Sequence, residues 1–180
     1  MAIDLKVDHY VRRVFLLGQS GAKVTEFDVP HLVLRRIDPL IILVELGTND
    51  LAAGVRAPVV ADSLQVLAQD LHHRYRAVVG VMSVLPRDKG LQDMTAKEFR
   101  EEVQQLDDIL KQCWVGSSAI FYHKHKGFWE MQDKSKKFDL PVSAWSKDGI
   151  HPNSERGRAR YKSSLRTAIY KALKSLGKKC

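Results

Sequence analysis

Residues 40–51 read Leu40-Ile41-Ile42-Leu43-Val44-Glu45-Leu46-Gly47-Thr48-Asn49-Asp50-Leu51 and join a continuous apolar run to a polar turn. The apolar run is β-branched in its middle, follows Asp38-Pro39 and ends at Gly47. Such a run is typical of a strand that is buried on both faces, as in a parallel sheet covered by helices. The sequence therefore predicts a central parallel strand over residues 40–46.

Gly47, Asn49 and Asp50 follow the carboxyl end of this predicted strand. In open α/β sheets that edge is where ligands bind, and an Asn amide there can donate a hydrogen bond into a small site. Asp50 can hold the turn or cap the next element. Asn and Asp are also common turn residues, so this stretch alone fits a simple Asx turn equally well.

Length and composition predict one soluble domain, spanning residues 1–180. The chain has 180 residues, of which 44% are hydrophobic, and its mean hydropathy is -0.25. That is enough for one ordinary core and too short for two domains. The sequence contains no internal repeat, no low-complexity segment and no apolar run near the ~20 residues of a membrane helix.

The N-terminus and the cysteines indicate an intracellular, cytoplasmic protein. Residues 1–8 carry charges where a signal peptide needs an apolar core. Cys113 and Cys180 are the only cysteines, which gives no disulfide framework and favours a reducing compartment.

We expect neither a metal nor a cofactor. His72-His73 and the His123/His125 pair lack a cluster of Cys or carboxylate ligands at metal-binding spacing, so we interpret them as surface histidines. The chain has no G-x-G-x-x-G motif and no P-loop, which argues against nucleotide binding. Phe128, Trp129 and Trp145 are interpreted as loop packing rather than as an acyl pocket or a base-stacking surface.

The net charge of +8 is concentrated near the C-terminus. Glu155 is followed there by a run of basic residues: Arg156, Arg158, Arg160, Lys162, Arg166, Lys171, Lys174, Lys178 and Lys179. Such a segment can attract nucleic acid or another acidic partner. A solvated helix face is the simpler interpretation, and we favour it.

The other apolar patterns alternate between strand and helix periods. Strands are predicted over 11–17, 77–85 and 115–122, and helices over 28–36, 58–75, 95–113 and from 154 onward. The third helix opens with a capping box at Thr95–Glu98. Residues 123–147 are predicted to be irregular. This order indicates an α/β fold with a parallel sheet and helices on both faces.

Asp148-Gly149-Ile150-His151 lies just before the last predicted helix. Its spacing lets the Asp148 carboxylate fold back onto the imidazole and fix its tautomer, which leaves the other ring nitrogen of His151 to act as a base. That is the Asp/His half of a nucleophilic hydrolase site. Taken alone, the motif is a weak signal, because an Asp in this position is more often a loop cap.

Together, Ser20-Gly21, Gly47–Asp50 and Asp148–His151 resemble the sequence blocks of the SGNH, or GDSL-like, hydrolase superfamily. The resemblance runs from about residue 11 to residue 176. It implies a flavodoxin-like, three-layer α/β/α sandwich that hydrolyses small acyl esters. Gly127-Phe128-Trp129 followed by Asp148–His151 also resembles the esterase-like domains of animal retroelements.

The resemblance also implies a role for each matching residue. His151 would be the general base that activates a serine and later protonates the leaving alcohol, and Asp148 would orient it. The oxyanion hole would consist of the Asn49 side chain, the Gly21 backbone N–H and the N–H of the nucleophile. Gly47 belongs to the same block as Asn49.

The family's G-D-S block, which carries the nucleophile, is missing from this chain. In one alignment residues 11–17 are the family's second strand, Gly21 is its glycine, and the first strand and the serine are absent. In the other, Gly18-Gln19-Ser20 is a degenerate G-D-S block and Ser20 is the nucleophile. The short spacing from Gly21 to Gly47 leaves room for one short helix and one strand, which favours the first alignment.

Two hypotheses of function follow from this sequence. The first is a serine-type ester hydrolase, impaired if its nucleophile is missing. The second is a non-catalytic module that descends from such a hydrolase and binds nucleic acid or a protein partner through the basic last helix.

Overall fold

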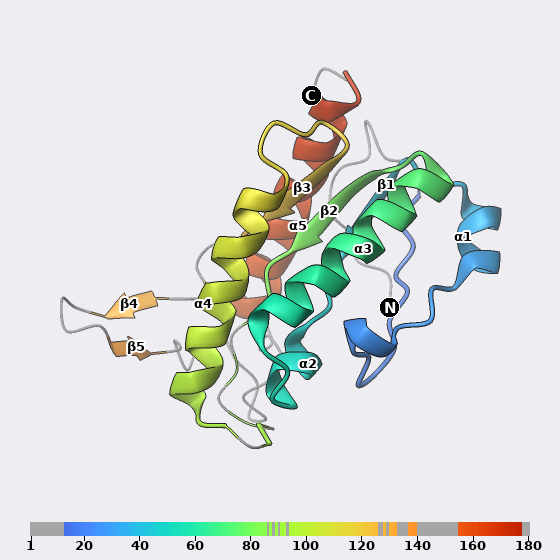
Figure 1. Cartoon of the computed structure of the whole chain (residues 1–180). Coiled ribbons are helices and arrows are strands. Elements are labelled where there is room, and N and C mark those ends of the chain that lie inside the picture. The colour runs from blue at the N-terminus through green and yellow to red at the C-terminus, as the bar shows by residue number, and fades with distance from the viewer. Residues whose placement is uncertain are drawn as a thin grey trace.

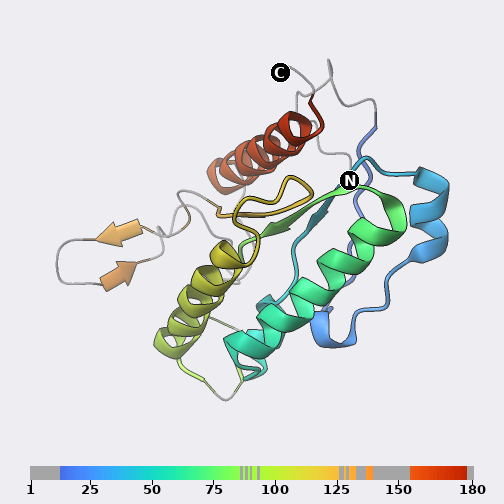
Figure 2. The ribbon, with the colours of Figure 1, turned by 45° about the horizontal axis from the view of Figure 1, so that its top comes forward.

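The computed structural model describes residues 13–85, 87, 89, 91–92, 94–125, 128, 130–132, 137–139 and 155–177. Its helices and strands, in chain order, are η1 (Val24–Glu26), α1 (His31–Ile37), β1 (Ile41–Val44), α2 (Thr48–Ala52), α3 (Ala57–Tyr75), β2 (Val78–Met82), α4 (Ala96–Cys113), β3 (Ile120–His123), β4 (Glu130–Gln132), β5 (Lys137–Asp139) and α5 (Arg156–Ser175). A parallel sheet in the order β1-β2-β3 lies between α3 and α4 on one face and α5 on the other (Figures 1 and 2).

The centre of the sheet is β2, whose five residues are all buried. Val79 pairs with Ile42 of β1 on one side and with Ile120 of β3 on the other, both in parallel register. This strand is the apolar run predicted over residues 77–85, shortened at both ends. The strand predicted over residues 40–46 is likewise confirmed as the shorter β1.

Alternate residues of β2 belong to the two cores of the molecule. Val79 and Val81 pack with the α3 and α4 side chains, whereas Val78 and Met82 pack with α5. A strand sends successive side chains to opposite faces, so a continuous apolar run buries both faces at once. The three-layer α/β/α arrangement expected from the sequence is confirmed.

The helices begin close to where their capping signals place them. The Thr95 hydroxyl accepts from the Glu98 N–H at 3.2 Å, and the Thr95 N–H donates to the Glu98 carboxylate at 2.6 Å, which completes the predicted capping box of α4. Pro58 lies in the first turn of α3, where its missing N–H costs nothing. The helix predicted over residues 28–36 is α1, which begins later, at His31.

The strand predicted over residues 11–17 is wrong for its described part. Residues 13–17 form no strand, and the side chains of Val14, Phe15, Leu16 and Leu17 are 44–51% exposed. An apolar segment becomes a strand only when a neighbour accepts its backbone hydrogen bonds. Within the described ranges no strand pairs with these residues or with the outer edge of β1.

The sequence analysis did not predict η1, α2, β4 or β5, and it predicted one strand longer than it is. β4 and β5 pair antiparallel, with Met131 opposite Phe138, within a segment that was predicted to be irregular. The short helix α2 follows Gly47 directly, where a turn was expected. β3 begins at Ile120 rather than at residue 115, because Gly116 has a φ of 80° and turns the chain.

Gly80 is the residue of β2 that permits the close approach of its neighbours. A Cβ at this position would lie 2.7 Å from Cζ of Phe121 and 2.8 Å from Cδ2 of Leu43. Gly80→Ala is therefore expected to lower the free energy of unfolding by about 1–3 kcal/mol, as overpacking of a core does. Urea denaturation checks this, with Gly18→Ala as the control because nothing lies within 4 Å of that position. Equal midpoints for the two variants would contradict the expectation.

Candidate functional site

Polar side chains gather where the parallel strands end. Glu45 follows β1, Ser83 follows β2, and His125 comes shortly after β3. The carboxyl ends of parallel strands lie at one edge of the sheet, which is the edge where ligands bind in this class of fold.

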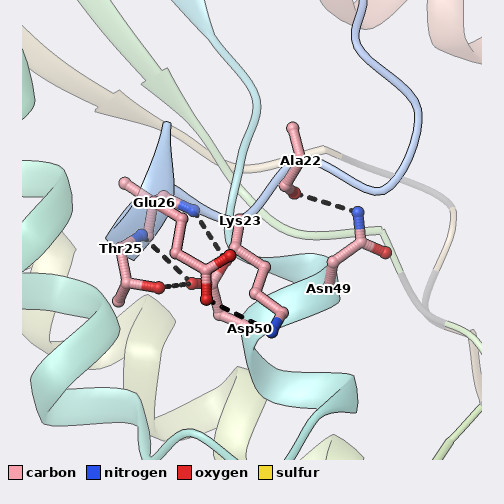
Figure 3. Close-up of polar contacts among 7 residues, drawn as sticks. Ala22, Lys23, Thr25, Glu26, Asn49 and Asp50 are labelled. Atoms are coloured by element: carbon pink, nitrogen blue, oxygen red, sulfur yellow. Dashed lines mark hydrogen bonds and ion pairs between the residues drawn. The ribbon is translucent and has the colours of Figure 1, made fainter. Parts of the chain in front are cut away.

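Asp50 is a wholly buried carboxylate that holds a distant segment of the chain. It accepts hydrogen bonds from the Val24 N–H at 2.9 Å, from the Thr25 N–H at 3.2 Å and from the Thr25 hydroxyl at 2.9 Å (Figure 3). The sequence analysis assigned Asp50 to its own turn or to a cap. It instead fixes η1 against α2.

Asn49, which precedes Asp50, contacts the same N-terminal segment of the chain. Its side-chain Nδ2 donates to the Ala22 carbonyl at 2.9 Å (Figure 3). Gly21, with a φ of 72°, and the exposed Ser20 belong to the turn that leads into Ala22. An amide carries two N–H groups, and the Ala22 carbonyl uses one of them. The structure thus brings Asn49 to the turn that carries the predicted site residues Gly21 and Ser20.

Gly47 contributes the sharp turn between β1 and α2. It is the N-cap of α2 and has a φ of 107°, a conformation that favours glycine. A Cβ here would also lie 3.0 Å from Cγ1 of Val60. The role of Gly47 is therefore conformational: its positive φ lets the chain turn from β1 into α2, which places Asn49 in the first turn of α2.

Arg87 is a site residue that the sequence analysis missed. It follows the carboxyl end of β2 and is only 6% exposed, and this burial lowers its pKa below the ordinary value for arginine. Its Nη1 lies 3.4 Å from Oδ1 of Asn49, and its Nε donates to the Lys89 carbonyl at 3.0 Å. A charged residue just after a buried central strand is the signal that could have found it.

His125 lies in a second polar cluster, between the strand ends and α5. It is 1% exposed, so its interpretation as a surface histidine is wrong, whereas His73 is exposed as expected. Its Nδ1 lies 2.8 Å from the Ser164 hydroxyl, and its backbone N–H donates to the Ser83 hydroxyl at 2.8 Å. The cluster joins β2 and β3 to the last helix.

Glu45 connects the same cluster to β1. Its Oε2 accepts from the Tyr161 hydroxyl at 2.5 Å and lies 3.7 Å from Nε2 of His125. Phe128 is fully buried, with its ring centroid 5.9 Å from that of His125, which confirms loop packing for this aromatic.

Within the described ranges, no three His, Cys or carboxylate side chains are grouped so that they could hold a metal.

Two partly buried tyrosines, Tyr122 of β3 and Tyr161 of α5, predict a loss of stability in alkali. Burial raises the pKa of Tyr161 and of Tyr122 far above the usual value, and the neighbouring carboxylates of Glu45 and Asp107 raise them further. The pKa of each tyrosine is therefore higher in the folded protein than in the unfolded chain. The stability that each protonated tyrosine contributes is complete below about pH 10 and is lost as the pH rises above that value. We expect the free energy of unfolding to fall by about 1.4 kcal/mol per pH unit for each tyrosine.

Urea denaturation at several values between about pH 8 and about pH 11.5 measures this slope. Tyr161→Phe removes one of the two phenols and leaves the ring, so its slope above pH 10 should be about half that of the wild type. Identical slopes for the two proteins would contradict the role of Tyr161.

Comparison with known protein families matches residues 3–156 to the GDSL-like lipase/acylhydrolase family. The chain belongs to this family. It is therefore a member of the SGNH hydrolase superfamily, as its sequence blocks indicated. The resemblance to retroelement esterase domains stays a prediction. The comparison with curated proteins found no significant match.

Two solved structures share the fold of this GDSL-like chain. One is described as a candidate acylhydrolase from Bacteroides fragilis, with a TM-score of 0.59 and 19% identity over 85% of this chain and 72% of that one. The other is described as a candidate platelet activating factor from Streptococcus pneumonia, with a TM-score of 0.57 and 15% identity over 84% and 69% of the two chains. At these identities the likeness establishes the fold alone.

The catalytic pair expected in this GDSL-like chain, Asp148 and His151, lies outside the described residues, as do Trp129 and Trp145. Their roles stay predictions. The last described helix, α5, begins shortly after His151 and packs Leu165, Ile169 and Leu173 against the sheet. None of the described helices has both the length and the apolar character needed to cross a membrane.

Proposed function

We propose that this chain is an ester hydrolase that acts on small acyl esters by serine-type acyl transfer. The observation that carries the proposal is the meeting of Asn49 and the Gly21–Ala22 turn at the carboxyl edge of the sheet, where Asp50 holds the two segments together. An amide N–H beside a glycine backbone is the donor set that a tetrahedral oxyanion needs. Family membership supports the same class of reaction.

The reaction proceeds in two acyl-transfer steps. A serine hydroxyl attacks the ester carbonyl while His151, oriented by Asp148, takes its proton. The oxyanion accepts hydrogen bonds from the Asn49 amide and the Gly21 N–H. The tetrahedral intermediate then expels the alcohol, which receives the proton from His151, and a water molecule releases the acyl group by the same route.

Ser20 is the candidate nucleophile within the described turn, since it is exposed and directly precedes Gly21. The alternative, which the sequence favours, is that the usual nucleophile is missing and Ser20 is a turn residue. Hydrolysis would then be slow, because water would attack with the help of the oxyanion donors alone. The two alternatives differ in one measurable property, the reactivity of Ser20.

Labelling with a fluorophosphonate probe, followed by peptide mapping, tests the proposal. A label on Ser20 that is lost in His151→Ala and in Ser20→Ala, but kept in the exposed-serine control Ser118→Ala, would establish a working serine esterase. A label on another serine would identify that residue as the nucleophile in place of Ser20. The absence of both label and ester hydrolysis would overturn the proposed function.

A second candidate function is the binding of nucleic acid or an acidic protein through α5. The charged residues of this helix are all basic, and the side chains of Arg158 and Lys162 are exposed. Binding of this kind weakens with salt and weakens further when Arg158, Lys162 and Arg166 are replaced by glutamine. Affinity that does not respond to salt would exclude it.

A further inference from the structure

The Asn49 carboxamide can donate to an oxyanion only in one of its two orientations. Rotation by half a turn exchanges Oδ1 with Nδ2. The described contacts discriminate between these orientations, because both ends of the amide have a partner. Nδ2 donates to the Ala22 carbonyl at 2.9 Å, and Oδ1 lies 3.4 Å from Nη1 of Arg87.

The two partners are complementary and therefore fix the amide. In the flipped orientation, Oδ1 would face the Ala22 carbonyl and Nδ2 would face the Arg87 guanidinium. Acceptor would then meet acceptor and donor would meet donor, so both hydrogen bonds would be lost together. Without Arg87, only the hydrogen bond to the Ala22 carbonyl would favour the observed orientation of the amide over the flipped one.

Arg87 is itself held in place. Its guanidinium is planar and rigid, and its Nε is fixed by the Lys89 carbonyl at 3.0 Å, which sets the direction of Nη1. The side chain is 6% exposed, so water competes little for its hydrogen bond to Oδ1 of Asn49.

We propose that Arg87 is a positioning residue that holds the Asn49 carboxamide with its NH₂ group available to the oxyanion. This inference rests on the proposed hydrolase function and adds to it a residue outside the sequence blocks. Lysine cannot replace Arg87, because an ammonium offers no planar fork that binds the Lys89 carbonyl and Asn49 at once.

Side-chain amide signals in a ¹⁵N–¹H NMR spectrum test the positioning without any need for activity. The Asn49 NH₂ pair is assigned by its loss in Asn49→Ala. In Arg87→Gln and in Arg87→Lys this pair should shift toward the positions of exposed asparagine amides, while most backbone signals stay unchanged. The control is Arg36→Gln, an exposed arginine of α1. An Asn49 pair that stays in place in both Arg87 variants would overturn the proposal.

Kinetics test whether Arg87 acts through Asn49. Arg87→Gln should lower kcat about 10²-fold, because a small misplacement of a catalytic group can cost that much, and should leave KM nearly unchanged. Arg87→Lys should not rescue the rate. The double variant with Asn49→Ala should be no slower than Asn49→Ala alone, since the guanidinium then has no amide to position.

Multiplicative losses in the double variant would overturn the proposal, because they would show that Arg87 acts independently of Asn49. A wild-type protein without any ester hydrolysis would overturn the proposed function instead. In that case the NMR measurement still decides whether Arg87 fixes the amide, so the two failures are distinguishable.

Discussion

Replacement of His151 by alanine is expected to lower kcat for ester hydrolysis by about 10⁴-fold or more, because the serine then has no base and the leaving alcohol has no acid. The activity that is left should be that of the oxyanion donors and substrate binding alone. Initial rates with para-nitrophenyl acetate measure the effect. KM should change little, since the imidazole acts mainly on the transition state.

The matched control is His73→Ala, which removes an exposed histidine of α3 far along the chain from the sequence blocks. Its activity should equal that of the wild type, and both variants should unfold at the same urea concentration as the wild type. Ester hydrolysis that survives in His151→Ala at the wild-type rate would assign the base to another residue. It would also remove the Asp148–His151 motif from the proposed mechanism.

Those parts of the fold that depend on local pattern were predicted correctly from the sequence. Val78–Met82 was found because a continuous apolar run rich in valine has few alternatives to a doubly buried strand. The capping box of Thr95 and Glu98 was found because both partners lie within one helical turn. The helix predicted from residue 154 onward was found from its helical period, and the observed α5 buries Leu165, Ile169 and Leu173.

The parts that depend on distant partners were missed. Residues 14–17 have the composition of a strand, but composition does not show whether a neighbouring strand pairs with them. His125 is buried because Ser83 and Ser164 supply hydrogen bonds from other elements. No local pattern around a histidine reveals such partners.

In the candidate site, too, residues in local motifs were predicted, and contacts with distant partners were missed. Gly47, Asn49 and Gly21 were selected by motif, and the structure brings Asn49 to the turn at Gly21. Arg87 was missed because it lies in a loop without a periodic pattern, and its partner, Asn49, is far away in the sequence. Asp50 was noticed, but its role was not, since its partners come from η1.

Asp50→Ala is therefore expected to be the most damaging substitution for stability in the described part of the site, lowering the free energy of unfolding by about 3 kcal/mol. The carboxylate satisfies the buried Val24 N–H and both donors of Thr25. An unsatisfied buried donor costs about 1–3 kcal/mol, and the wholly buried side chain also leaves a cavity. Asp50→Asn keeps one acceptor oxygen and should lose about half as much.

Urea denaturation compares these variants with Asp62→Ala, which removes an exposed carboxylate of α3 and should change stability by less than about 0.5 kcal/mol. Because Asp50 also holds η1 against α2, its loss frees the segment that carries Gly21 from the helix that carries Asn49. Trypsin should then cut after Lys23 faster in Asp50→Ala than in Asp62→Ala, under conditions where both are folded. Equal urea midpoints and equal rates of cleavage after Lys23 in the two variants would show that Asp50 does not hold the Gly21 segment against α2.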